Sequence, residues 1–122
     1  MVRRFAGLLL GMLVLTGPAW ADGDAAEGEK VFAKCRACHS AEPGKNGVGP
    51  SLAGVFGRKS GTLPGFTYSK AMVEKALVWD EKTLAGYLTD PRGFVPGNKM
   101  VFLGLKKQSE IDNLLAFLKT KK

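Results

Sequence analysis

The chain has 122 residues, enough for one domain with a modest core, and a formal charge of +7 at pH 7. Two cysteines and one histidine are too few ligands for a four-ligand structural zinc site. The basic balance could suggest a nucleic-acid partner, but no nucleic-acid-binding motif is present, so we expect none.

The N-terminus has the parts of a secretory signal peptide. A basic start at Arg3 and Arg4 is followed by an apolar stretch and by the small-x-small ending Ala19–Ala21. The apolar stretch is too short to span a bilayer comfortably, which disfavours an uncleaved membrane anchor. We therefore expect residues 1–21 to be cleaved and residues 22–122 to form a single domain in the periplasm. Loss of the two arginines lowers the formal charge from +7 to +5.

The first helix is expected over residues 25–34. Asp24 is a typical N-cap, and Glu27 follows at the spacing of a capping box. Gly28 lies inside this helix, where glycine costs about 1 kcal/mol relative to alanine. It indicates either the close approach of another helix or a tolerated surface glycine, and periodicity alone does not separate the two.

The residues that follow, Cys35-x-x-Cys38-His39, match the attachment motif of a c-type haem. Cysteines one helical turn apart share a face, so their sulfurs can bond the two vinyl groups at one edge of a porphyrin, and His39 can coordinate the iron. A thioredoxin-type motif would need a βαβ surround, and a disulfide here would close a very small loop. The motif therefore predicts one covalently bound haem c.

Glycine and proline divide the rest of the chain into two long loops and short helices. The loops are expected over residues 40–68 and 91–104. The first loop carries apolar side chains too numerous for a disordered segment, which indicates that it wraps a ligand. These side chains are Leu52, Val55, Phe56, Leu63, Phe66 and Tyr68.

Three more helices are expected, and no strand, so the predicted fold class is all-α. One follows Ser69 and ends near Lys75, the next covers residues 81–89 after an Asp80 N-cap, and the last opens with a capping box at Ser109–Asp112. The inward stripe of the last helix is Ile111, Leu114, Leu115, Phe117 and Leu118.

The second axial ligand cannot be another histidine, because His39 is the only one in the chain. Met72, Met100, a deprotonated lysine or an open position remain. A lysine would need deep burial to lose its proton near neutral pH, and Met72 lies in a helical segment where methionine usually fills core space. Met100 lies in a Gly/Pro loop that can aim one side chain, so the residues favour Met100 without excluding Met72.

Further segments make residues 22–122 similar to class I cytochromes c, in the branch that joins mitochondrial cytochrome c and bacterial cytochrome c-two. The resemblance implies the all-α class I cytochrome c fold, with helices of unequal length and long Gly/Pro loops wrapped around one covalently attached haem. Its specific pieces besides the haem motif are Gly49–Leu52, Phe56–Lys59, Pro64–Ser69, Trp79, Tyr87–Leu88, Pro96–Phe102 and Leu114–Leu118.

The resemblance also implies roles for individual residues. Cys35 and Cys38 would carry the haem thioethers, and His39 and Met100 would be the axial ligands. Pro50 would offer its carbonyl to the His39 ring N–H. The other implied contacts are a haem propionate with Arg58, Tyr68 and Trp79, the Met100 sulfur with Tyr87, the haem crevice with Phe102, and a crossing of the first and last helices at Gly28, Phe32, Leu114 and Phe117.

Two departures from the mitochondrial members stand out. Met72 occupies a position where those members usually carry a polar residue near the haem, so the local hydrogen-bond network and the potential are expected to differ. The segment before Cys35 is one residue shorter, which fits the bacterial branch.

In the family, lysines around the exposed haem edge steer docking onto acidic redox partners, and Lys34, Lys99, Lys106 and Lys107 match that ring. Such fields accelerate encounter and weaken with salt. The expected partners are an oxidase, a bc1-type complex, a reaction centre or a dehydrogenase. We expect a monomer that meets the membrane only through those partners.

The predicted function is that of a soluble electron carrier, not an enzyme. An iron with both axial positions filled has no position for oxygen or peroxide but can still pass electrons, and a thioether ligand raises its potential. The alternative is a haem peroxidase or gas-binding sensor in which Met100 does not bind the iron.

Overall fold

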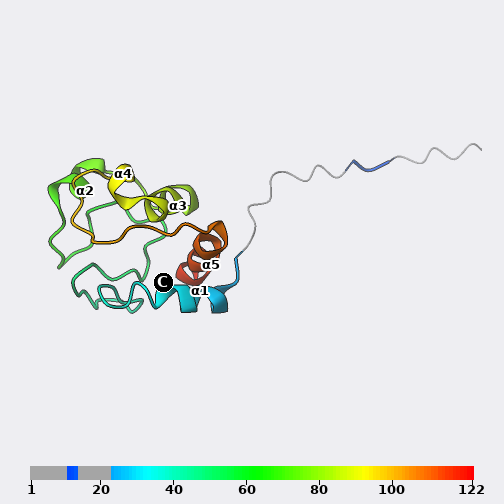
Figure 1. Cartoon of the computed structure of the whole chain (residues 1–122), viewed down its shortest axis with the longest axis horizontal. Helices are drawn as coiled ribbons and strands as arrows, with labels where there is room; N and C mark the ends of the chain where they lie inside the picture. Colours follow the sequence, from blue (N-terminus) through cyan, green and yellow to red (C-terminus); the bar gives the residue numbers. More distant parts are fainter. Residues whose placement is uncertain (1–10, 14–22) are drawn as a thin grey trace, which may run out of the picture.

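The computed structural model describes residues 11–13 and 23–122. The predicted signal peptide and its cleavage site lie outside these ranges, apart from residues 11–13, and stay a prediction. The described chain contains α1 (Ala25–Phe32), α2 (Lys70–Lys75), α3 (Glu81–Thr89), α4 (Pro91–Phe94) and α5 (Gln108–Lys119) (Figure 1). Within the described ranges, no helix combines the length and the apolar character that a membrane crossing requires.

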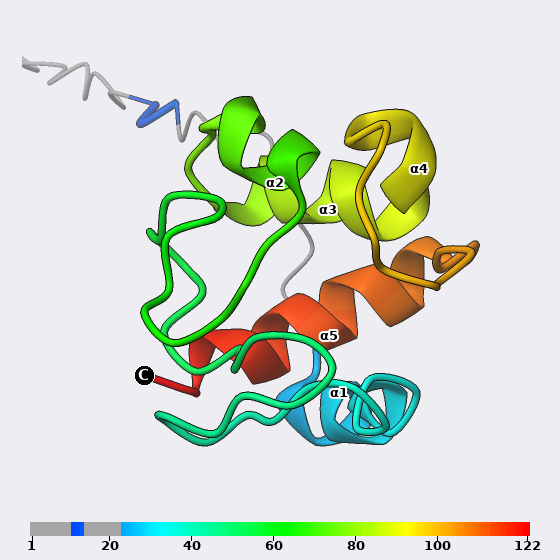
Figure 2. The same cartoon turned by 90° about the vertical axis from the view of Figure 1, so that its left-hand side faces the viewer.

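The two ends of the domain meet where α1 crosses α5 (Figure 2). A Cβ at Gly28 would lie 1.8 Å from the Asn113 carbonyl oxygen and 2.8 Å from Cβ of Phe117. One turn later, Phe32 is fully buried, with its ring centroid 5.2 Å from that of Phe117. Gly28 is therefore a site of close helix approach, which confirms the first of the two interpretations.

The N-terminus of α1 is capped as expected by Asp24, whose carboxylate accepts from two backbone N–H groups. The predicted capping box with Glu27 is wrong. The backbone N–H of Asp24 instead donates to Asn113 Oδ1 at 2.8 Å, and Glu27 pairs with Lys30 at 3.0 Å. The acceptor of the Asp24 N–H is therefore Asn113, on the helix that crosses α1, and not Glu27, which the local sequence predicted.

The predicted capping box at the start of α5 is also wrong. The N-cap is Lys107, two residues before the expected Ser109, and it gives no side-chain cap. Asp112, the acidic residue of the predicted box, accepts from Gln108 Nε2 at 2.8 Å instead of bonding back to Ser109, and Glu110 pairs with Lys34 at 3.0 Å. The predicted inward stripe is confirmed, because its members are all buried: Ile111, Leu114, Leu115, Phe117 and Leu118.

The expected loop over residues 91–104 begins with a short helix that the sequence analysis missed. Asp90 caps α4 through a 3.1 Å bond from the Gly93 N–H, and Pro91 occupies the first turn, where it needs no hydrogen-bond donor. At four residues, α4 is too short to show a helical period. The preceding helix α3 starts at Asp80 as predicted, with Thr83 completing a capping box.

Two groups of helices face each other across the fold. The first group is α1 with α5, and the second is α2, α3 and α4 (Figure 2). The two groups touch where α3 packs against α5, and the connecting loops enclose the rest of the space between them. The described chain has no strand beyond an isolated bridge between Lys59 and Val78. Of the apolar side chains in the first loop only Val55 is fully buried, and the others are half-buried.

Candidate functional site

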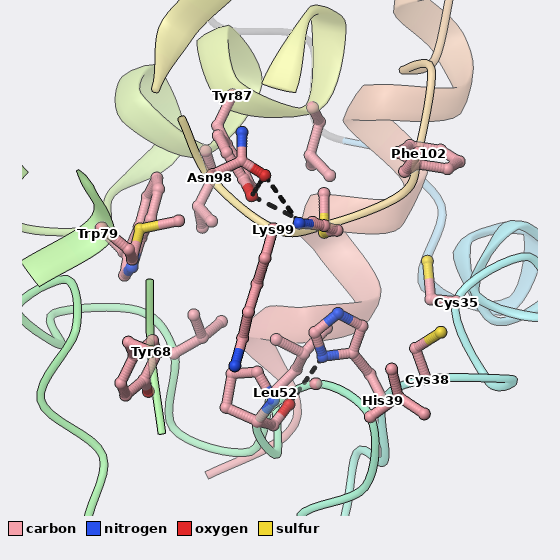
Figure 3. Close-up of a pocket in the computed structure, with 18 of the residues that line it drawn as sticks. Cys35, Cys38, His39, Leu52, Tyr68, Trp79, Tyr87, Asn98, Lys99 and Phe102 are labelled. Carbon is pink, nitrogen blue, oxygen red and sulfur yellow. Dashed lines mark hydrogen bonds between the residues drawn. The ribbon is translucent and has the colours of Figure 1, made fainter. Parts of the chain in front are cut away.

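A cavity of about 300 Å³ lies between the helices and the two loops, and its walls are mostly apolar. Lys106 and Lys107 are the predicted site residues that do not line it. The others do; Tyr87 lies on α3 and the rest come from the turns after α1 and from the loops (Figure 3): Lys34, Cys35, Cys38, His39, Pro50, Arg58, Tyr68, Trp79, Tyr87, Lys99, Met100 and Phe102. The structure thus brings together residues separated by more than half of the chain.

The two cysteines lie at the end of α1, where the helix continues as turns. The Cys35 N–H donates to the Phe32 carbonyl at 2.8 Å, and the His39 N–H donates to the Cys35 carbonyl at 2.8 Å. This winding places Cys35 and Cys38 on the cavity side of the segment (Figure 3). The two sulfurs are not joined in a disulfide, and burial raises the pKa of the Cys35 thiol.

The His39 imidazole is held on one side by the loop that follows it. Its Nδ1 donates to the Pro50 carbonyl oxygen at 2.7 Å. The ring lies directly against Gly49, because a Cβ there would be 2.3 Å from His39 Cε1. Burial lowers the pKa of His39, and the Pro50 hydrogen bond opposes that shift. A neutral ring that donates through Nδ1 presents the Nε2 lone pair to the cavity (Figure 3).

Met100 faces the cavity from the loop after α4. The Tyr87 hydroxyl, on α3, lies 3.7 Å from Met100 Sδ. The Tyr87 ring packs 5.2 Å from Trp79, centroid to centroid, and burial raises the pKa of Tyr87 to about 12. Met72 lines the same cavity, so lining alone does not separate the two methionines. Of the two methionines, only Met100 has its sulfur within hydrogen-bond distance of the Tyr87 hydroxyl in the described structure, and that hydroxyl also lies 3.5 Å from Asn98 Oδ1.

Polar groups gather where the first loop meets the cavity. The Arg58 guanidinium donates to the Ser51 carbonyl at 2.9 Å and to the Ala53 carbonyl at 2.5 Å. The Tyr68 hydroxyl accepts from the Leu63 N–H at 3.2 Å. Burial lowers the pKa of Arg58, and the neighbouring Tyr68 opposes that shift. These side chains give an otherwise apolar cavity one end that can bind anionic groups.

The predicted docking lysines differ in their surroundings. Lys34 pairs with Glu110, whereas Lys99 and Lys106 each donate to backbone carbonyls of neighbouring segments. Lys107 has no side-chain partner within the described chain and is exposed. Next to them, Val101 and Leu103 are 90% and 78% exposed. The surface beside the cavity is therefore basic with apolar side chains in it.

Two residues with clear structural roles at the site were not singled out from the sequence. Gly49 allows the His39 ring to lie against the backbone, and Asn98 bonds the backbone of Met100 at 2.9 Å. A signal for Asn98 was present, since an asparagine two residues before Met100 in a Pro-Gly-Asn turn fits an Asx-turn.

Residues 25–122 match the family model described as cytochrome c. The chain belongs to the cytochrome c family. It is 56% identical over 95 residues to cytochrome c2 iso-2 from Magnetospirillum fulvum, covering 78% of this chain and 99% of that one. It is 46% identical over 116 residues to cytochrome c2 from Blastochloris viridis, covering 92% of this chain and 91% of that one. The solved structure of cytochrome cH from Methylobacterium extorquens superposes with a TM-score of 0.78 at 49% identity, covering 81% of this chain and 100% of that one.

Membership of the cytochrome c family confirms the predicted class I fold and the predicted cofactor, one covalently attached haem c. The cavity fits that group: it combines two thiols at its edge, an imidazole, thioether sulfurs and apolar walls. The relatives are electron carriers, so this chain is a monohaem electron carrier and not an enzyme.

Proposed function

We propose that this chain is a periplasmic cytochrome c in which His39 and Met100 are the two axial ligands of the haem iron. The observation that carries the proposal is the arrangement of donors around one cavity. The imidazole presents Nε2 from the segment after α1, and the Met100 thioether enters from the loop after α4. The Tyr87 hydroxyl at the Met100 sulfur favours Met100 over Met72.

The chain's own residues hold these donors in place. Cys35 and Cys38 form the covalent attachments, and the Pro50 carbonyl fixes the plane of the His39 ring. When bound, the haem iron accepts and releases one electron at a time. Imidazole on one side and thioether on the other leave it no open position for oxygen or peroxide and raise its potential.

The apolar walls keep water away from the site, and Phe102 contributes to them at the loop after Met100. A haem also carries two carboxylates, whose charge needs hydrogen-bond donors when buried. Arg58, Tyr68 and Trp79 supply donor groups at the cavity wall. These three residues therefore serve a haem propionate.

The partners are redox proteins with acidic docking surfaces: an oxidase, a bc1-type complex, a reaction centre or a dehydrogenase. Basic side chains and exposed apolar ones lie together beside the cavity. Opposite charge on the partner speeds encounter, and small apolar contacts bring the cofactors near each other. Lys34, Lys99, Lys106 and Lys107 supply that charge, and the carrier acts as a monomer.

Absorption spectra of the purified holoprotein test the ligand assignment. A ferric far-red band from the methionine–iron bond is expected, and the ferrous protein should resist carbon monoxide. Met100→Leu should abolish the band and allow rapid carbon monoxide binding, because no thioether then fills the position. Met72→Leu is the matched control and should keep both properties. Rapid carbon monoxide binding by the unchanged protein would instead place it with the sensors or peroxidases.

A further inference from the structure

The segment that presents Met100 has few backbone hydrogen bonds. From residue 99 to residue 104, Met100 carries the only backbone N–H with a hydrogen-bond partner in the described structure. That partner is the side-chain oxygen of Asn98, at 2.9 Å. The stretch is held again only at its far end, where the Leu105 N–H donates to the Leu88 carbonyl at 2.8 Å.

The Asn98 carboxamide is bound on both of its sides. Its Nδ2 donates to the carbonyls of Pro91 and Val95, each at 2.9 Å, while Oδ1 accepts from Met100. Two carbonyl acceptors can be satisfied only by the NH₂ group, so the amide cannot be turned around without losing all three bonds. The orientation of Oδ1 toward Met100 is therefore determined by α4.

Both carbonyls belong to a rigid part of the fold. Pro91 opens α4 and Val95 follows its last residue, and both are buried. The helix packs against α3, which carries Tyr87. The same amide oxygen lies 3.5 Å from the Tyr87 hydroxyl, which lies 3.7 Å from Met100 Sδ (Figure 3). The packed helices α3 and α4 therefore position both the Met100 backbone, through Asn98, and the Tyr87 hydroxyl that donates to the Met100 sulfur.

We propose that Asn98 is the positioning residue for the methionine ligand, holding Met100 through α4 so that its sulfur stays at the iron. The inference rests on the proposed His39/Met100 ligation. Without the amide, no backbone N–H from residue 99 to residue 104 would have a partner in the described structure, and the segment would be held only by the backbone bonds of Asn98 and Leu105 at its two ends. The ligand would then leave the iron more often while the fold remained.

Asn98→Ala tests this, with Asn113→Ala as the matched control. Asn113 is also half-buried and also accepts a backbone N–H at 2.8 Å, but at the α1–α5 crossing away from the cavity. The rate of carbon monoxide binding to the ferrous protein measures how often Met100 leaves. Loss of these hydrogen bonds should raise it at least about tenfold in Asn98→Ala, with the far-red band lost at a lower denaturant concentration than helical structure. Asn113→Ala should lose the far-red band and helical structure at the same denaturant concentration. Its carbon monoxide binding rate should equal that of the unchanged protein.

Asn98→Ser distinguishes the contribution of the Met100 hydrogen bond from that of the bonds to the α4 carbonyls. Its hydroxyl can still accept the Met100 N–H, but with a single O–H it cannot donate to both the Pro91 and the Val95 carbonyl. An intermediate carbon monoxide rate is expected, and this variant gives a result even if Asn98→Ala does not fold. Equal rates in Asn98→Ser, Asn113→Ala and the unchanged protein would overturn the role of Asn98. A missing far-red band in the unchanged protein would overturn the ligand assignment itself.

Discussion

At Gly49, a hydrogen atom occupies the space where any other side chain would meet the His39 ring. A Cβ there would be 2.3 Å from Cε1 and 2.7 Å from Nδ1. The neighbouring Pro50 carbonyl oxygen accepts from Nδ1 of the same ring at 2.7 Å. The imidazole therefore cannot move toward Gly49 or rotate without losing this hydrogen bond. The backbone at Gly49 therefore fixes the position of the His39 imidazole on one side.

Gly49→Ala is expected to destabilise the holoprotein by about 1–3 kcal/mol, because the ring must move to admit the methyl group. The same movement should shift the haem absorption bands. Denaturant unfolding followed by absorption and by circular dichroism measures both effects. Lys45→Ala is the control, since Lys45 is an exposed residue of the same loop outside the cavity lining. Unchanged stability and spectra in Gly49→Ala would contradict this account of the ring's position.

At the scale of elements, the crossing of α1 and α5 joins the ends of the domain and positions the haem motif. The end of α1 leads directly into the turns that carry Cys35 and Cys38, and α5 forms part of the cavity wall through Leu114 and Leu118. Any change in the distance between the two helices therefore moves the attachment site relative to that wall.

Gly28→Ala tests this crossing, with two opposing effects. Alanine improves helix propensity by about 1 kcal/mol. Its Cβ would, however, lie 1.8 Å from the Asn113 carbonyl oxygen, which belongs to backbone and cannot rotate away. We expect a net loss of about 1–3 kcal/mol in the free energy of unfolding, measured by urea titration. Glu29→Ala, at an exposed position of the same helix, should leave stability nearly unchanged. A more stable Gly28→Ala would show that the helices can separate freely.

At the scale of the whole molecule, charge is arranged around the cavity opening, but the lysines there are not equivalent. Lys34 is paired with Glu110, and Lys106 is bound to carbonyls, so part of their charge is engaged within the chain. Lys107 has its full charge exposed to solvent. It is therefore the lysine whose removal should alter long-range attraction with least disturbance of the fold.

Lys107→Gln is expected to slow electron transfer with an acidic redox partner about two- to threefold at low ionic strength, because one attractive charge is lost. The difference should vanish in high salt, where surface charges are screened. Stopped-flow oxidation of the ferrous protein over a salt series measures it. Lys82→Gln removes the same charge from α3, outside the cavity lining, and should have a smaller effect. Equal effects of Lys107→Gln and Lys82→Gln would show that the rate depends on the net charge of the protein and not on a docking site at Lys107.

The haem motif, the family and most helices could be predicted from the sequence because their signals are local. Cys35–His39 is contiguous, Asp80 caps its own helix, and the α5 stripe repeats with the helical period. Features that depend on other elements were missed. The capping box at α1 failed because Asn113, distant in the chain, accepts the Asp24 N–H, and the one at α5 failed because that helix starts after Lys107 rather than after Ser109. The role of Asn98 depends on carbonyls of α4, a helix too short to be seen in the pattern.

Helix α2 stands apart from the other helices. Its backbone approaches none of them closely within the described structure, and its link to α4 is the Lys75 ammonium 5.3 Å above the Phe94 ring. It ends at Ala76 in a left-handed conformation, and Met72 faces the cavity. This corner is held by the first loop, where the Ser60 N–H donates to the Leu77 carbonyl at 2.7 Å, and the prosthetic group would supply the contacts that no helical neighbour gives. We therefore expect the side of the protein around α2 to become ordered only after the porphyrin has been joined to the chain.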